Sequence, residues 1–91
     1  MRRATVIRVD DGATVVIRPN MAVKLAGLTP PARGTPGAVA AKERLESLVL
    51  NKKIEFETET WDRLGRSLAN VWIDGVDVNG AMAEFLASLE A

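Results

Sequence analysis

Five short strand-like runs, two of which alternate apolar and polar residues, constrain the fold of this chain more than any other feature. In the clearest of them Ile54, Phe56 and Thr58 lie on one face of a strand, and lysine and glutamate residues occupy the other face. The five predicted strands cover residues 2–9, 14–18, 21–26, 53–60 and 67–73. Turn residues at 11–12 and 18–21 join the first three strands, which predicts a strongly curved meander.

Two further segments show helical spacing. Thr35 and Pro36 are typical of an N-cap and a first helical position, and Asn51 can end this helix in the left-handed conformation. Its apolar face consists of Ala38, Ala41, Leu45, Leu48 and Val49. Asn79 is predicted to cap a second helix, whose apolar stripe consists of Met82, Phe85, Leu86 and Leu89.

The predicted helices follow the third and the fifth strand, which is the element order of an OB-type barrel. We therefore expect a mainly β fold, a five-stranded OB-fold-type barrel with two helices. The 91 residues form one domain, 1–91. A domain of this size buries only about 60–65% of its unfolded surface, so its core is small.

Composition excludes several classes of site. The chain has no cysteine and no histidine, which removes disulfide, thiolate and imidazole chemistry and, with them, the ordinary zinc enzymes. Twelve basic and twelve acidic residues give a formal net charge of zero, so nucleic-acid binding would depend on a local basic patch. No apolar segment of a signal peptide follows Met1-Arg2-Arg3, so we expect a cytoplasmic chain, or the mature form of an exported one, without membrane association.

Four motifs occur in a distinctive order. They are Asp-Gly-Ala-Thr at 11–14, Val-Lys-Leu-Ala-Gly-Leu-Thr-Pro-Pro-Ala at 23–32, Asp-Arg-Leu-Gly-Arg-Ser-Leu-Ala at 62–69 and Asp-Gly-Val-Asp-Val-Asn at 74–79. In these motifs the chain resembles the staphylococcal-nuclease-like (thermonuclease, SNase) family, from about Thr5 to Ala87. In that family the four motifs usually read, in the same order, Asp-Gly-Asp-Thr, Val-Arg-Leu-x-Gly-Ile-Asp-x-Pro-Glu, Asp-x-Tyr-Gly-Arg-x-Leu-Ala and Asp-Gly-x-x-Val-Asn. The resemblance implies the same OB-type fold.

The resemblance also implies a chemistry for which most of the residues are replaced. Members of the family hydrolyse phosphodiesters with a calcium ion, and calcium prefers several oxygen ligands, mainly carboxylates. The two main carboxylate positions correspond to Ala13 and Thr29, and the glutamate that activates water corresponds to Ala32. Loss of a general base alone costs about 10²–10⁴ in rate. We therefore expect a degenerate metal site, with Asp11 nearby, no bound calcium and no calcium-dependent nuclease activity.

The two arginines that hold the phosphate in the family correspond to Lys24 and Arg66. Lysine keeps the charge but not the planar fork of arginine, so Arg66 is the catalytic position that is retained unaltered. Arg66 could hold a phosphate, bond the carbonyls of the loop at 30–31, or pair with Asp62. Asp10 and Asp11 are expected to point to opposite faces of a strand, which is more typical of a polar turn than of an ion site.

Aromatic residues add candidates for binding, because rings stack on bases in single-strand-binding barrels. Trp72 is expected to fill the core or cover a barrel end, whereas Trp61 is expected to be exposed. The candidate binding residues are therefore Lys24, Arg66, Trp61 and Arg63. A stripe of glutamates at positions 55, 57 and 59 would repel phosphates that pass over that face.

Three functions follow from these observations. The chain could be a nuclease-like domain that has lost its catalytic residues and binds nucleic acid, another phosphate-bearing ligand or a protein. It could be a nuclease of this family with an altered site, or a small structural or oligomerising barrel. We favour the first function. A protein partner or a second copy would have a docking surface on the C-terminal helix, where Phe85, Leu86 and Leu89 are left with little cover.

Overall fold

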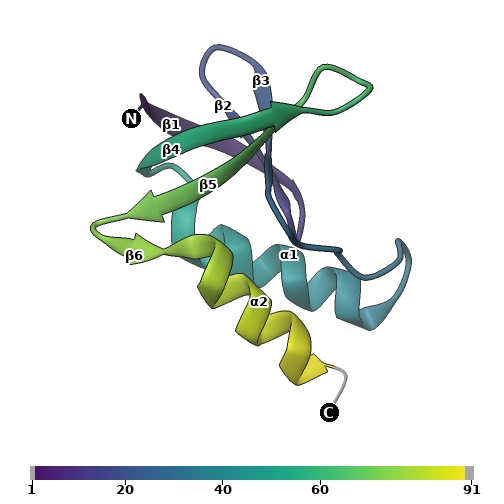
Figure 1. The fold of residues 1–91 in the computed structure, drawn as a ribbon. Helices are drawn as coiled ribbons and strands as arrows, with labels where there is room; N and C mark the ends of the chain where they lie inside the picture. The colour runs from purple at the N-terminus through teal and green to yellow at the C-terminus, as the bar shows by residue number, and fades with distance from the viewer. Residues whose placement is uncertain (1, 90–91) are drawn as a thin grey trace.

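Five strands curve into a barrel, and two helices pack side by side beneath it (Figure 1). The computed structural model describes residues 2–89. The strands are β1 (Arg2–Asp11), β2 (Thr14–Ile17), β3 (Met21–Leu25), β4 (Lys53–Trp61), β5 (Ser67–Ile73) and the short β6 (Val76–Asp77). The helices are α1 (Pro36–Val49) and α2 (Val78–Leu89).

The sheet has the order β3-β2-β1-β4-β5-β6, and a parallel pairing of β3 with β5 closes it into a barrel. All other neighbouring strands are antiparallel. This mixed five-stranded barrel with two helices is consistent with the OB-type fold, as predicted. The two-residue β6 was not predicted. It forms because Asp74 and Gly75 take positive φ angles of 49° and 79°, which turn the chain back along β5.

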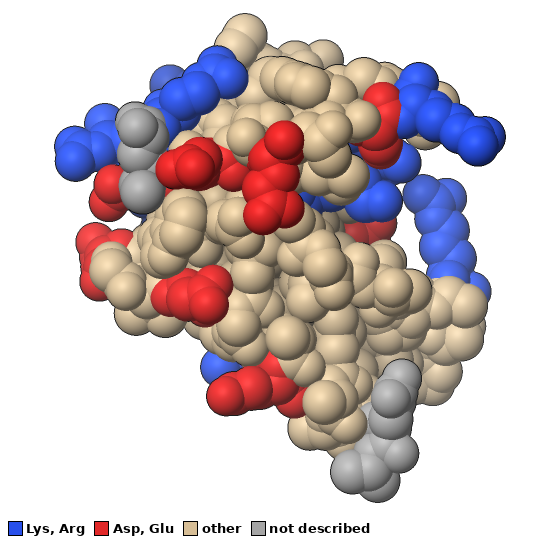
Figure 2. Space-filling model, in the orientation of Figure 1, with Lys and Arg blue, Asp and Glu red and all other residues tan. Residues whose placement is uncertain are grey.

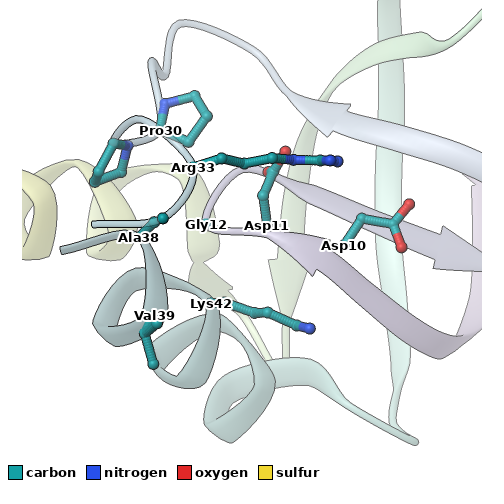
Figure 3. A pocket seen from close by; sticks show the side chains of 10 residues that line it. Asp10, Asp11, Gly12, Pro30, Arg33, Ala38, Val39 and Lys42 are labelled. Atoms are coloured by element: carbon teal, nitrogen blue, oxygen red, sulfur yellow. The ribbon is translucent and has the colours of Figure 1, made fainter. Parts of the chain in front are cut away.

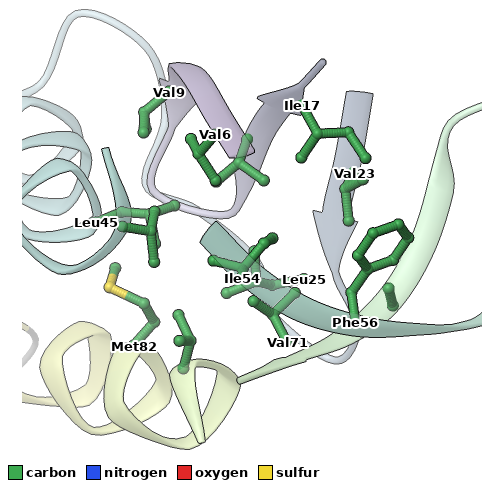
Figure 4. Packing of buried hydrophobic residues seen from close by; sticks show 14 of the residues in the cluster. Val6, Val9, Ile17, Val23, Leu25, Leu45, Ile54, Phe56, Val71 and Met82 are labelled. Atoms are coloured by element: carbon green, nitrogen blue, oxygen red, sulfur yellow. The ribbon is translucent and has the colours of Figure 1, made fainter. Parts of the chain in front are cut away.

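The core lies between the inner face of the barrel and the two helices (Figure 4). Its largest buried side chains are Phe56, Leu25, Leu45, Ile54 and Met82. In β4 the expected alternation is confirmed, since Ile54 and Phe56 are buried between charged neighbours. In β5 the inward residues are Ser67, Ala69 and Val71. Trp72 is half-buried on the other face, opposite Glu55, so the first of the two alternatives for it, the core, is wrong, and cover of a barrel end stays a prediction.

The helix ends agree with the sequence at α1 and differ from it at α2. Thr35 caps α1 as predicted, with Oγ1 accepting from the Ala38 N–H at 3.2 Å, and Asn51 follows the helix at a φ of 63°. At α2 the predicted cap is wrong. Asp77 accepts from the Gly80 N–H through Oδ1 at 3.1 Å, and Asn79 lies buried inside the first turn of the helix.

Asn79 instead joins three segments of the fold. Its side-chain amide donates to the backbone oxygens of Ala26 and Ala69, each at 3.1 Å, and its Oδ1 accepts from the Val71 N–H at 2.9 Å. These bonds tie α2 to the ends of β3 and β5, and therefore fix the loop that follows β3. Neither helix in the described part of the chain is long and apolar enough to span a membrane.

Candidate functional site

The turn between β1 and β2 carries Ala13, the first position to which the resemblance assigns a calcium ligand. Ala13 is completely buried; its N–H donates to Oδ1 of Asp11 at 2.8 Å, and its carbonyl accepts from the Leu25 N–H at 2.8 Å. The Asp11 carboxylate therefore closes a polar turn, as the sequence predicts. Gly12 lies directly on α1, since a Cβ at this position would be 2.5 Å from Cβ of Ala41.

Lys24 lies at the centre of the barrel wall. It pairs with Thr14 on β2 and with Leu68 on β5, and it is half-buried. Among residues 2–89 no carboxylate lies within 4.0 Å of its ammonium group. The neighbouring Thr14 is buried, and its Oγ1 has no hydrogen-bond partner within the same described range. Within this range the ammonium group of Lys24, at the position where the resemblance implies an arginine, is therefore not paired with a carboxylate.

The loop after β3 holds at the surface the next two positions to which the resemblance assigns a role in catalysis. Thr29 and Ala32 are both exposed, and the Ala32 carbonyl accepts from Oγ1 of Thr35 at 2.7 Å at the start of α1. Pro30 and Pro31 between them approach the turn at 10–12, with which they line a common pocket. The loop and the turn at 10–12 are therefore neighbours in the fold, and of the three positions to which the resemblance assigns the calcium ligands and the base, Thr29 alone has a polar side chain.

Arg66 is paired inside its own hairpin. Its Nε donates to Oδ2 of Asp62 at 2.7 Å, and Oδ1 of Asp62 accepts from the backbone N–H groups of Leu64 and Arg66 at 2.9 and 2.8 Å. Burial of the Asp62 carboxyl acts to raise its pKa. The hydrogen bonds from Arg66 and Leu64, together with the charge of the guanidinium, outweigh burial and lower the pKa below its ordinary value. Of the alternatives drawn from the sequence, the structure contains the pair with Asp62.

The pocket beside the loop has a volume of about 280 Å³ and combines charged groups with an apolar wall (Figure 3). Its lining consists of Asp10, Asp11, Gly12, Pro30, Pro31, Arg33, Gly34, Ala38, Val39 and Lys42. The two aspartates line it together, although neighbouring strand residues are expected on opposite faces. The alternation is relaxed because the ladder between β1 and β2 shifts register between Val9 and Asp11.

This lining shows which residues sequence reasoning missed. Lys24 and Arg66 do not line the pocket, and its cations are Arg33 and Lys42. Arg33 directly follows the proline motif and could have been noticed for that reason. Lys42 lies on a helix and carries no motif, and Asn79 was interpreted as a cap, so their positions become evident only from the fold.

A calcium ion does not fit the side chains at this site. Asp10 is engaged by Nε of Arg8 at 2.8 Å, and Asp11 uses Oδ1 for the Ala13 N–H. The positions to which the resemblance assigns the other ligands hold alanine and threonine. Within the part of the chain that the structure covers, no group of three or more acidic residues is placed to hold a metal ion. Hard cations require several oxygen ligands, so the donor set is too small.

The hairpin between β4 and β5 exposes the remaining candidates. Trp61 ends β4 with 52% of its surface exposed, as expected, and Leu64 at the tip is 77% exposed beside the exposed Arg63. Figure 2 shows acidic side chains across the middle of one face of the molecule and basic ones along its upper edges. On this face the charges are mixed, so binding of a phosphate backbone would have to be local.

The C-terminal helix borders an apolar groove. Met82 is buried, Phe85 and Leu86 are half-buried, and Leu89 is 39% exposed. A groove of about 400 Å³ lies between this helix and the loop; its lining consists of Thr29, Pro30, Pro31, Thr35, Gly37, Leu86 and Leu89. Its use by a protein partner or a second copy stays a prediction.

The fold and the motifs together define a small OB-type barrel of the nuclease-like kind. The family model for staphylococcal nuclease homologues matches residues 22–88, and the chain belongs to this family. The matched segment includes the motifs that begin at 23, 62 and 74, whereas the Asp-Gly-Ala-Thr motif precedes it. A search of curated proteins gave no match.

Proposed function

We propose that this domain binds single-stranded nucleic acid and does not hydrolyse it with calcium. The observation that carries the proposal is the chemistry at Ala13, Thr29 and Ala32, where two calcium ligands and the water-activating glutamate would be needed. The family's retained basic positions, Lys24 and Arg66, still provide charge for a phosphate, which needs only hydrogen-bond donors and a positive potential.

The β4–β5 hairpin supports binding through its exposed groups. Trp61 offers a ring face to a base, and Arg63 lies two residues further along the same hairpin. Because β5 runs beside β3, the hairpin leads directly to the position of Lys24, which pairs with Leu68. A strand that stacks on Trp61 would therefore pass basic groups from both segments.

Tryptophan fluorescence tests the proposal. A Trp72→Phe variant keeps Trp61 as the single reporter and is titrated with single-stranded DNA at low and at physiological salt. We expect quenching that is equal in calcium and in chelator, and an apparent affinity that falls as salt rises, because phosphate contacts release counterions. Arg63→Ala and Lys24→Ala should each weaken binding, whereas Lys52→Ala, an exposed lysine in the turn before β4, should not.

Two results would contradict the proposal in different ways. Binding that requires calcium would favour a nuclease with an altered site. A fluorescence spectrum that stays unchanged at low salt would exclude nucleic-acid binding through Trp61 and leave the protein-binding and structural functions.

A further inference from the structure

The pocket of about 280 Å³ beside the loop carries opposite charges from three separate segments. Asp10 and Asp11 end β1, Arg33 lies in the loop and Lys42 lies on α1. In Figure 3 the Arg33 and Lys42 side chains extend in the same direction past Asp11, with Asp10 beyond them. These positions are separate from Lys24 and Arg66, so the inference below does not depend on the proposed function.

No ion pair joins the charged groups of this pocket to one another in the described part of the chain. The ion pairs found between residues 2 and 89 are Arg3 with Glu55, Arg8 with Asp10, and Arg66 with Asp62, and none of them crosses the pocket. Arg33 and Lys42 therefore have no carboxylate within 4.0 Å in this range. Asp11 uses Oδ1 for the Ala13 N–H, and no bond in the same range engages its Oδ2. The pocket thus has donors and an acceptor available for a ligand that carries both kinds of group.

Its remaining wall is apolar. Pro30 and Val39 line it from the loop and from the helix, and Val39 is largely exposed although it is a branched aliphatic residue. A ligand that entered between the charged groups would therefore meet an aliphatic surface on one side. Such a combination of a mostly apolar wall and a few convergent polar groups is typical of small-molecule sites.

The chemistry of the lining indicates the kind of ligand. Two cations, a carboxylate and an apolar wall line one pocket. A free amino acid with an aliphatic side chain, such as leucine, carries a carboxylate, an ammonium group and an apolar group, so it offers a partner to each part of this lining.

We propose that this pocket binds a small zwitterion, an aliphatic α-amino acid. Its carboxylate contacts Arg33 and Lys42, its ammonium group donates to Asp11, and its side chain lies against Pro30 and Val39. The carboxylate and the ammonium group of the amino acid are recognised by charge, and the apolar wall of the pocket favours an aliphatic side chain over a polar one. The binding is weak, with a Kd on the order of 1 mM, because so few atoms make contact.

Amide NMR on the whole chain tests this inference with leucine as the probe. We expect saturable shifts for residues 10–12, 33–34 and 38–42, and little change at the hairpin 61–66. N-acetyl-leucine lacks the ammonium group and leucinamide lacks the carboxylate, so each should bind at least about fivefold more weakly. Serine, which has both charged groups but no aliphatic side chain, should also bind more weakly.

Variants distinguish leucine binding in this pocket from nonspecific attraction to charged side chains. Lys42→Gln and Arg33→Gln should each weaken leucine binding several-fold while the amide spectrum stays folded. Lys52→Gln removes an exposed lysine elsewhere and should leave binding unchanged. An unchanged spectrum at leucine concentrations tenfold above the expected Kd would overturn the proposal. Equal binding of N-acetyl-leucine would overturn it as well, because the pocket would then be a simple anion site.

Discussion

Arg66 and Asp62 form a closed pair within one hairpin, in which Nε of the arginine donates to Oδ2 of the carboxylate at 2.7 Å. The other carboxylate oxygen accepts two backbone N–H groups of the same turn, from Leu64 and Arg66. Asp62 therefore shapes the hairpin as well as binding the guanidinium. A phosphate could be contacted by Arg66 through its remaining N–H groups while this pair is intact.

The pair predicts a particular dependence of stability on pH. The pKa of Asp62 is lowered in the folded chain, so its contribution to stability is complete above the ordinary aspartate pKa of about 3.9 and is lost as the pH falls through the folded value. Asp62→Asn should therefore lower the melting temperature at neutral pH. The difference from the parent should shrink below about pH 4, as measured by circular dichroism at a series of pH values.

A matched control uses another turn aspartate. Asp74 is exposed with a φ of 49°, which asparagine also tolerates, so Asp74→Asn should change little at any pH. If the Asp62→Asn difference stays constant from neutral to strongly acid pH, the carboxylate charge is not what stabilises the hairpin.

The fold could be predicted because its signals are local. Alternation in β4, the Thr35 cap and the left-handed Asn51 each depend on neighbouring residues, and the structure confirms them. Asn79 shows that local signals do not predict contacts between residues that are distant in the sequence. An asparagine before a helical segment is typical of a cap, but its partners at Ala26 and Ala69 are brought to it by the closure of the barrel.

Less of the candidate site could be predicted, because sequence signals are local and the site combines residues that are distant in the sequence. Family motifs identify Ala13, Thr29 and Lys24 as positions, but no motif marks Lys42, which reaches the pocket only because α1 packs under the turn at 10–12. The shared pocket of Asp10 and Asp11 depends on a register shift in the β1–β2 ladder, which the period of two along a strand does not reveal.

The buried amide of Asn79 should be important for stability. Asn79→Leu removes the acceptor of the buried Val71 N–H and the donor to the carbonyls of Ala26 and Ala69. The Ala69 carbonyl keeps one donor, the Ala26 N–H at 2.8 Å. We expect a loss on the order of 2–4 kcal/mol in the free energy of unfolding, measured by urea titration. Asn70→Ala, which removes an exposed bond to Glu59, should cost less than about 1 kcal/mol. Equal losses in the two variants would contradict a structural role for Asn79.

We predict that position 12 requires glycine because its backbone lies directly against α1. In Gly12→Ala the new Cβ would lie 2.5 Å from Cβ of Ala41, so the turn and the helix must separate, at a cost of about 1–3 kcal/mol. Ala41→Gly removes the opposing methyl group and costs about 1 kcal/mol by helix propensity. If the clash is the cause, the double variant loses less stability than the sum of the two single variants. Additive losses would show that Gly12 is needed for another reason.

The proposal that this domain has no calcium-dependent activity can be tested by introducing the residues that the resemblance assigns to that activity. The parent chain should show no calcium-dependent cleavage of single-stranded DNA or RNA, and calcium should not raise its melting temperature, since Ala13, Thr29 and Ala32 provide no carboxylate. A variant with Ala13→Asp, Thr29→Asp, Ala32→Glu and Lys24→Arg should be less stable than the parent without metal, because position 13 is completely buried. Calcium should then stabilise this variant in a concentration-dependent way, as any ligand does that binds the folded state alone. Cleavage by the parent that disappears in Arg66→Ala would reverse the conclusion, because it would show that the altered site is itself catalytic.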